Sequence, residues 1–218
     1  MRYLNSNLEY LKQKNFIIYN EIKRRTFKYD KTNNNKFNII NTRDGYKTIE
    51  VNYNSENIRL NSIFSPKKEA ERWAKKFDDT GKITSLIMYG LGNGIFFDEL
   101  KMKIDNHAYI FFYEPNIDLF IFILYNFDLK NILSDERTEL FIKDINDIDL
   151  YIELCRKINW TMIPTQLVCC HPVYDRLYKE QFQKFIHIIE EYRYAMKISG
   201  NTSVEFAKKF TLNTIKNL

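Results

Sequence analysis

The stretch MYGLGNGIFFDEL, residues 88–100, decides the fold, because three glycines in it join an apolar run to an amphipathic one. The apolar run, ITSLIMY at 83–89, is typical of a strand buried on both faces, and the residues after it predict a helix over 94–104. Glycine after a strand allows a positive φ and lets a ligand approach the backbone, and a helix N-terminus attracts anions. The stretch therefore predicts either a nucleotide or phosphate cradle or a tight turn that holds no ligand.

The residues that follow repeat this alternation of strand and helix. The further expected strands are 108–113, 138–142 and 166–170, and the helices between them are 116–126 and 146–158. Such an alternation implies a mainly parallel sheet with right-handed crossovers. We therefore expect a Rossmann-like α/β domain, whose first helix begins at Pro66 after the N-cap residue Ser65.

The two flanks of this domain have patterns of their own. One helix is expected over 6–25, and the hairpin signal Asp44-Gly45 predicts a small antiparallel β meander over 36–62. The tail keeps a helical period that Gly200 is expected to interrupt. The predicted fold class is α/β, with a Rossmann-like mainly parallel sheet and flanking helices, preceded by a helix plus meander and followed by C-terminal helices. The predicted domains are 1–64, 65–172 and 173–218.

The glycine spacing and a later acid suggest a nucleoside pocket. The spacing G-x-G-x-G differs from the dinucleotide fingerprint G-x-G-x-x-G and resembles the first motif of class I S-adenosylmethionine methyltransferases. Glu114 follows the second strand, where an acid would hold ribose hydroxyls, and His171 follows the last strand at the same sheet edge. The alternative is a tight turn with a solvated glutamate. The candidate ligand-binding residues are Gly90, Gly92, Asn93, Gly94, Glu114, Asn116 and His171, and the candidate ligands are a CMP-sugar or S-adenosylmethionine.

Composition excludes several other classes of function. The net charge is +5, but its one basic cluster, Lys23 to Lys28, suits a solvated helix end, so nucleic acid is not an expected partner. Three cysteines, of which two are adjacent, argue against a disulfide framework and favour the reducing cytoplasm. No second Cys or His cluster accompanies Cys169 to His171, so no metal site is expected. The most apolar window, 117–127, is about half as long as a membrane span.

Four segments follow one another along the chain: LNSIFSPKKEAERWAKKF, SLIMYGLGNGIFFDEL, YIFFYEPNIDLFIFIL and DLKNILSDERTELFI. Together they resemble the N-terminal region of the motility-accessory-factor (Maf) proteins, a family associated with flagellin glycosylation by nonulosonic acids. The resemblance covers about residues 58–142. It implies an N-terminal accessory domain with no catalytic residues of its own, with flagellin and a downstream glycosyltransferase domain as partners. The ending FTLNTIKNL looks like the helix before that domain, so we expect the natural chain to continue.

Three hypotheses for the function follow. The first is a non-catalytic module of a flagellin glycosyltransferase, which positions the catalytic domain, recognises flagellin or holds a nucleotide-like ligand. The second is a methyltransferase-like enzyme that uses Gly90 to Gly94 and Glu114, although the chain offers fewer strands than such enzymes have. The third is an interaction scaffold whose Rossmann pocket is empty.

Overall fold

The core of the protein is a four-stranded parallel sheet, seen in a computed structural model that describes residues 3–26, 36–78, 82–142, 149–158 and 160–216. The strand order is β6-β5-β4-β7, so the chain moves outward from β4 and then returns to the other side of it. This order confirms the predicted Rossmann-like α/β class. The strands are β4 (Ile83–Tyr89), β5 (Ile104–Tyr113), β6 (Thr138–Phe141) and β7 (Gln166–Cys170).

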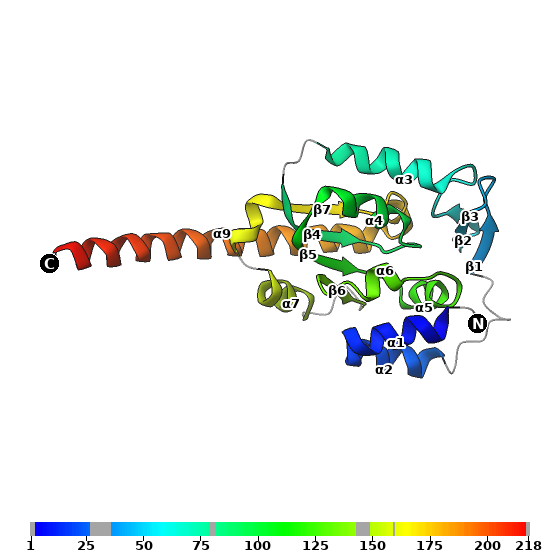
Figure 1. The fold of residues 1–218 in the computed structure, drawn as a ribbon, viewed down its shortest axis with the longest axis horizontal. Coiled ribbons are helices and arrows are strands. Elements are labelled where there is room, and N and C mark those ends of the chain that lie inside the picture. The colour runs from blue at the N-terminus through cyan, green and yellow to red at the C-terminus, as the bar shows by residue number, and fades with distance from the viewer. Residues whose placement is uncertain (1–2, 27–35, 79–81, 143–148, 159, 217–218) are drawn as a thin grey trace.

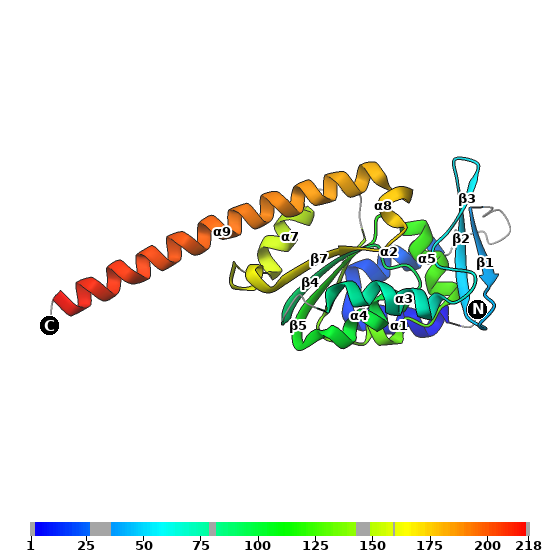
Figure 2. The same ribbon diagram turned by 90° about the horizontal axis from the view of Figure 1, so that it is seen from above.

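Helices cover both faces of this sheet. Figure 2 shows α7 and the first half of α9 along one face, with α3 and α4 on the other. Because both faces are covered, the middle of the sheet is apolar, and Leu86, Ile87 and Phe112 are fully buried. The helices are α3 (Pro66–Ala74), α4 (Ile95–Leu100), α5 (Ile117–Asn126), α6 (Lys130–Leu133), α7 (Asp149–Lys157), α8 (Tyr174–Leu177) and α9 (Lys179–Lys216). The expected start of α7 at 146 lies outside the described residues.

The predicted meander is also confirmed. Strands β1 (Phe37–Asn41), β2 (Lys47–Tyr53) and β3 (Glu56–Arg59) form an antiparallel sheet in that order. Gly45 takes the positive φ of +85° that the turn between β1 and β2 needs. The meander stands at the carboxyl end of the parallel strands, on the side where the glycine loop emerges (Figure 1).

The N-terminal segment differs from the single helix expected over 6–25. It forms two helices, α1 (Leu4–Lys14) and α2 (Phe16–Thr26), which are separated at Asn15. The side-chain oxygen of Asn15 accepts a hydrogen bond from the backbone N–H of Ile18 at 3.0 Å, so Asn15 ends the first helix and caps the second. The break lets the chain fold back, and Leu11 and Ile22 are both fully buried.

The helix after the glycine loop is shorter than expected. It ends at Leu100 and a 3-10 turn follows, so the prediction of helix through residue 104 is wrong. Ile104 instead begins β5, where it pairs with Ile83 of β4. Polar residues between Ile104 and Ala108 obscured this part of the strand in the sequence.

The tail beyond Leu177 is one long helix rather than two. Helix α9 runs for 38 residues and passes through Gly200, so the predicted break there is wrong. A glycine inside a helix costs only about 1 kcal/mol relative to alanine, which neighbouring turns can offset. The first part of α9 packs on the sheet, where the ring of Phe185 contacts those of Tyr89 and Tyr113, and its remainder projects away from the body of the molecule (Figure 1).

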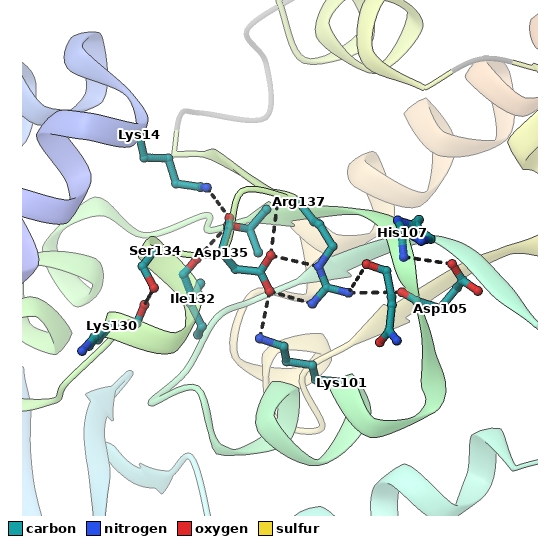
Figure 3. A network of polar contacts seen from close by, with 11 residues as sticks. Lys14, Lys101, Asp105, His107, Lys130, Ile132, Ser134, Asp135 and Arg137 are labelled. Atoms are coloured by element: carbon teal, nitrogen blue, oxygen red, sulfur yellow. Dashed lines mark hydrogen bonds and ion pairs between the residues drawn. The ribbon is translucent and has the colours of Figure 1, made fainter.

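A polar network around Asp135, which lies just before β6, links helix α1 to that edge strand of the sheet (Figure 3). The Asp135 carboxylate binds the guanidinium of Arg137 through two bonds of 2.9 and 2.7 Å and the amine of Lys101 at 2.8 Å. The amine of Lys14 in α1 donates to the backbone carbonyl of Asp135. Arg137 and Lys101 hold the pKa of Asp135 well below its usual range, so this carboxylate stays ionised.

Candidate functional site

The predicted site residues meet at the carboxyl edge of the parallel sheet. The strand order reverses between β4 and β7, and ligands of open α/β sheets bind at such a switch point. The glycine loop follows β4, and His171 follows β7 and donates its backbone N–H to the carbonyl of Tyr89 at 2.9 Å. Glu114 follows β5, whose end is also joined to β4, because the N–H of Gly90 donates to the carbonyl of Tyr113. The topology therefore brings together residues that are far apart in the sequence.

Glu114 is a buried carboxyl group that is fully engaged by the protein. One oxygen accepts hydrogen bonds at 3.0 Å from the backbone N–H of Leu91 and at 3.0 Å from the hydroxyl of Tyr174. The other oxygen accepts from the backbone N–H of Asn116 at 3.2 Å. Burial raises the pKa of Glu114 to about 7, although these hydrogen bonds act in the opposite direction. The group is therefore not the solvated glutamate of the alternative reading.

The side chain of Tyr174 fills the space above the first glycine. A Cβ atom built on Gly90 would lie 2.3 Å from Cδ1 of the Tyr174 ring, so no larger residue fits without movement. The Tyr174 hydroxyl also accepts a hydrogen bond from the backbone N–H of Gly92 at 3.3 Å while it donates to Glu114. In dinucleotide-binding Rossmann domains an acid at this strand end holds a ribose hydroxyl. Here the acid is Glu114, and the hydroxyl that it binds belongs to Tyr174 of the same chain rather than to a ribose.

His171 closes the loop in the same way at the second glycine. A Cβ on Gly92 would lie 2.6 Å from Nε2 of His171, and the ring of Phe96 meets the imidazole edge-on at 4.8 Å between centroids. Nδ1 accepts from the backbone N–H of Val173 at 3.4 Å, whereas Nε2 is buried without a hydrogen-bond partner among the described residues. Burial lowers the pKa of His171 to about 3, so the imidazole is neutral. A neutral, enclosed imidazole is suited to packing rather than to proton transfer.

The remaining candidates connect the loop to neighbouring elements. Asn93 donates from its amide to the carbonyl of Lys47 at 3.2 Å and so links the loop to the meander. Gly94, at φ +88°, is the N-cap residue of α4. Asn116 caps α5 through its side-chain oxygen, and its amide donates to the hydroxyl of Tyr178 at 2.9 Å. The side chains of Asn93 and Asn116 therefore have structural partners within the chain.

Tyr174 and Tyr178 are the site residues that sequence reasoning missed. Both are buried, and their rings pack edge-to-face at 5.3 Å. The signal was present as two tyrosines four residues apart in a helical segment directly after His171. Their role depends on a fold that carries α8 over the loop, which no local pattern specifies.

The backbone N–H groups of the glycine loop are already bonded within the protein. The N–H groups of Leu91 and Gly92, which a nucleotide would contact in an open loop, bind Glu114 and Tyr174 instead. Burial raises the pKa of the Cys170 thiol at the end of β7, so it is not an activated nucleophile. Within the described ranges, no three His, Cys, Asp or Glu side chains are grouped so that they could hold a metal ion.

Comparison with known proteins gives one structural likeness. No protein-family model matches the sequence, and no curated protein matches it. The structure is similar to the crystal structure of MnmC2 from Aquifex aeolicus, with a TM-score of 0.30 and 17% sequence identity. The match covers 67% of this chain and 59% of that one, so the chain spans about three fifths of the length of MnmC2.

Among the residues that the structure describes, no helix combines the length and the apolar character required to cross a membrane.

Proposed function

We propose that the chain is a non-catalytic α/β module, which holds a neighbouring catalytic domain in position within a Maf-type flagellin glycosyltransferase of the cytoplasm. The observation that carries this proposal is the self-filled glycine loop. The side chains of Tyr174 and His171 occupy the space over Gly90 and Gly92. The carboxyl group of Glu114 binds the Tyr174 hydroxyl and so holds this ring in place. A loop filled by its own chain has no room for the nucleotide of a donor sugar or for S-adenosylmethionine.

Helix α9 supports the positioning role. With 38 residues it is about 57 Å long, and it is anchored at its start by buried Phe185 and Tyr192. Beyond Tyr192 the described side chains are largely exposed, including Tyr194 and Ile198. A continuous helix fixes both the distance and the rotation of whatever follows it. The resemblance of the chain to the N-terminal region of Maf proteins names the glycosyltransferase domain as the element to be positioned.

Ligand binding tests the closed loop. Thermal unfolding is measured with S-adenosylmethionine, with CMP and with a CMP-linked nonulosonate, because a ligand at 100 times its Kd would add about 2.7 kcal/mol of stability. We expect no stabilisation by any of them. Stabilisation by S-adenosylmethionine would instead favour the methyltransferase reading, and stabilisation by CMP compounds would favour a donor-binding module.

Helical phase tests the positioning role. In the full-length gene, two alanines inserted after Ser199 would rotate everything downstream by about 200°, whereas seven inserted residues would restore the rotation to within about 20°. Flagellin glycosylation, measured by mass spectrometry, is expected to fall with the first insertion and to recover largely with the second. Equal glycosylation in both strains would contradict a positioning role for α9.

A further inference from the structure

A groove lies between the turn that joins β1 to β2 and the outward side of helix α3. Arg43 and Asp44 of the turn form one wall, and Lys68 and Arg72 of the helix belong to the other. The two walls are held together through the backbone, because the N–H of Arg43 donates to the carbonyl of Ile63 at 2.9 Å. Helix α3 packs through its opposite side, so both of its basic side chains in the groove are exposed.

The groove carries more positive than negative charge. Its lining contains four basic and two acidic side chains, namely Arg43, Lys68, Arg72 and Lys75 against Asp44 and Glu71. All four basic side chains are exposed, and none of them forms an ion pair with another residue in the described part of the chain. Among the described residues, the guanidinium of Arg72 binds the backbone carbonyl of Lys68 through Nε alone, at 3.2 Å, so its terminal nitrogens remain available. The groove therefore has an excess of positive charge that its own acids do not cancel.

An exposed aromatic ring lies among these cations. Phe64 lines the groove and is 57% exposed, although large apolar side chains are usually buried. The guanidinium of Arg43 lies over this ring, 4.5 Å from its centroid, in a cation–π contact. Aromatic rings and guanidinium planes are the groups on which unpaired bases of nucleic acids stack. Phe64 and Arg43 together therefore form a stacking surface inside a positively charged groove.

We propose that this groove binds a segment of single-stranded nucleic acid, whose phosphates contact the basic side chains while a base stacks on Phe64 and Arg43. Lys68 and Lys75 are separated by roughly 10 Å along the helix axis, so a strand with repeated phosphates reaches both, whereas a single phosphate does not. The basic residues come from position 43 and from 68–75, so no continuous basic run marks the groove, and the sequence alone does not predict this partner. The proposal is independent of the role of α9 and leaves the glycine loop closed.

Other occupants match these features less well. A second copy of the chain carries the same net charge of +5 and would be repelled from a positive groove. The carboxylates of an acidic peptide would neutralise the cations but supply no flat ring to cover Phe64 and Arg43. The surface of an anionic membrane is flat, whereas these cations line a hollow of about 730 Å³. A strand with both phosphates and bases satisfies the charge and the stacking surface together.

Fluorescence anisotropy with three labelled polyanions tests the proposal. The first is oligothymidylate of about ten nucleotides, the second is an abasic strand with the same number of phosphates, and the third is an oligoglutamate peptide of equal charge. We expect oligothymidylate to bind with a Kd below roughly 100 μM at about 0.1 M salt, and the other two to bind about fivefold or more weakly. No binding of oligothymidylate would overturn the proposal. Equal or tighter binding of the abasic strand or of oligoglutamate would also overturn it, because charge alone would then explain the binding.

Three variants locate the binding site. Arg72→Glu should weaken oligothymidylate about tenfold or more. Arg24→Glu makes the same charge change at an exposed arginine of α2, which lies across the sheet from α3 (Figure 1), and should leave binding nearly unchanged because salt screens charges beyond about 10 Å. Phe64→Ala should weaken oligothymidylate about fivefold or more and leave the abasic strand unaffected.

Thermal unfolding shows that each of these surface variants is folded. Equal losses from Arg72→Glu and Arg24→Glu would place the strand on the basic end of α2 or spread it over the surface, and would overturn the proposal. Unchanged binding of oligothymidylate by Phe64→Ala would likewise overturn it, because the stacking surface would then have no part in recognition.

Discussion

Replacement of Glu114 by glutamine should change how the stability of the protein depends on pH. Glu114 is 1% exposed, and burial raises its pKa from 4.5 to about 7. The folded state therefore keeps the proton between these two pH values, while the unfolded chain releases it. The stability that this group contributes is fully present below pH 4.5 and is lost as the pH rises to about 7. At about 1.4 kcal/mol for each pKa unit, the loss amounts to roughly 3 kcal/mol.

His171 masks this effect in the unmodified protein. Burial lowers its pKa from 6.5 to about 3, so the stability contributed by the neutral imidazole is present above pH 6.5 and is lost as the pH falls toward 3. Between pH 4.5 and 6.5 the two trends oppose each other. The difference in stability between the unmodified protein and Glu114→Gln removes the contribution of His171 and isolates that of the carboxyl group.

Urea unfolding of both proteins, from below pH 4.5 to above pH 7, measures this difference. The advantage of the unmodified protein should shrink by about 3 kcal/mol across that range. Glu190→Gln, at an exposed position on α9, serves as the control and should give a flat difference. A difference for Glu114→Gln that is flat, or that grows with pH, would refute the burial of this carboxyl group.

Other substitutions test individual contacts by urea unfolding. Gly90→Ala and Gly45→Ala place a Cβ at nearly the same φ, +84° and +85°, but only the first meets another side chain. Gly45→Ala should therefore cost about 1–2 kcal/mol from backbone strain, and Gly90→Ala a further 1–3 kcal/mol or so from the collision with Tyr174; equal costs would show that Tyr174 lies elsewhere. Tyr174→Phe should cost about 1–3 kcal/mol, since it leaves the N–H of Gly92 without an acceptor, and a neutral result would contradict that bond. Asp135→Asn should destabilise the protein at neutral pH, and the penalty should fade as the pH drops below about 4, where the unfolded carboxyl group takes up its proton; a penalty that is constant with pH would contradict the ion pairs of Asp135.

The parallel sheet could be predicted because its signals are local. Continuous apolar runs such as 83–89 mark strands buried on both faces, and Asp44-Gly45 marks a hairpin. Boundaries failed where a local signal was weak or was overridden. Asn15 could have been recognised as an N-cap inside an apparently continuous helix, whereas the passage of α9 through Gly200 depends on the small cost of one glycine within a long helix.

The candidate site was predicted in its position but not in its state. The sequence places the glycine loop, Glu114 and His171 at one sheet edge, because the carboxyl ends of parallel strands meet there. It does not show that Tyr174, which follows Gly90 by more than eighty residues, lies on that glycine. Whether a Rossmann loop is open or filled depends on contacts between distant segments, and only the folded structure contains them.

The most direct measurement of the closed loop is hydrogen exchange at the amides of Leu91 and Gly92 in the ligand-free protein. Both N–H groups are buried and bonded, to Glu114 at 3.0 Å and to the Tyr174 hydroxyl at 3.3 Å. We predict that both exchange as slowly as the amides of β4, and that Tyr174→Phe accelerates Gly92 more than Leu91. Fast exchange of both amides in the unmodified protein, slowed by an added nucleotide or by S-adenosylmethionine, would contradict the account and would show an open, ligand-binding loop.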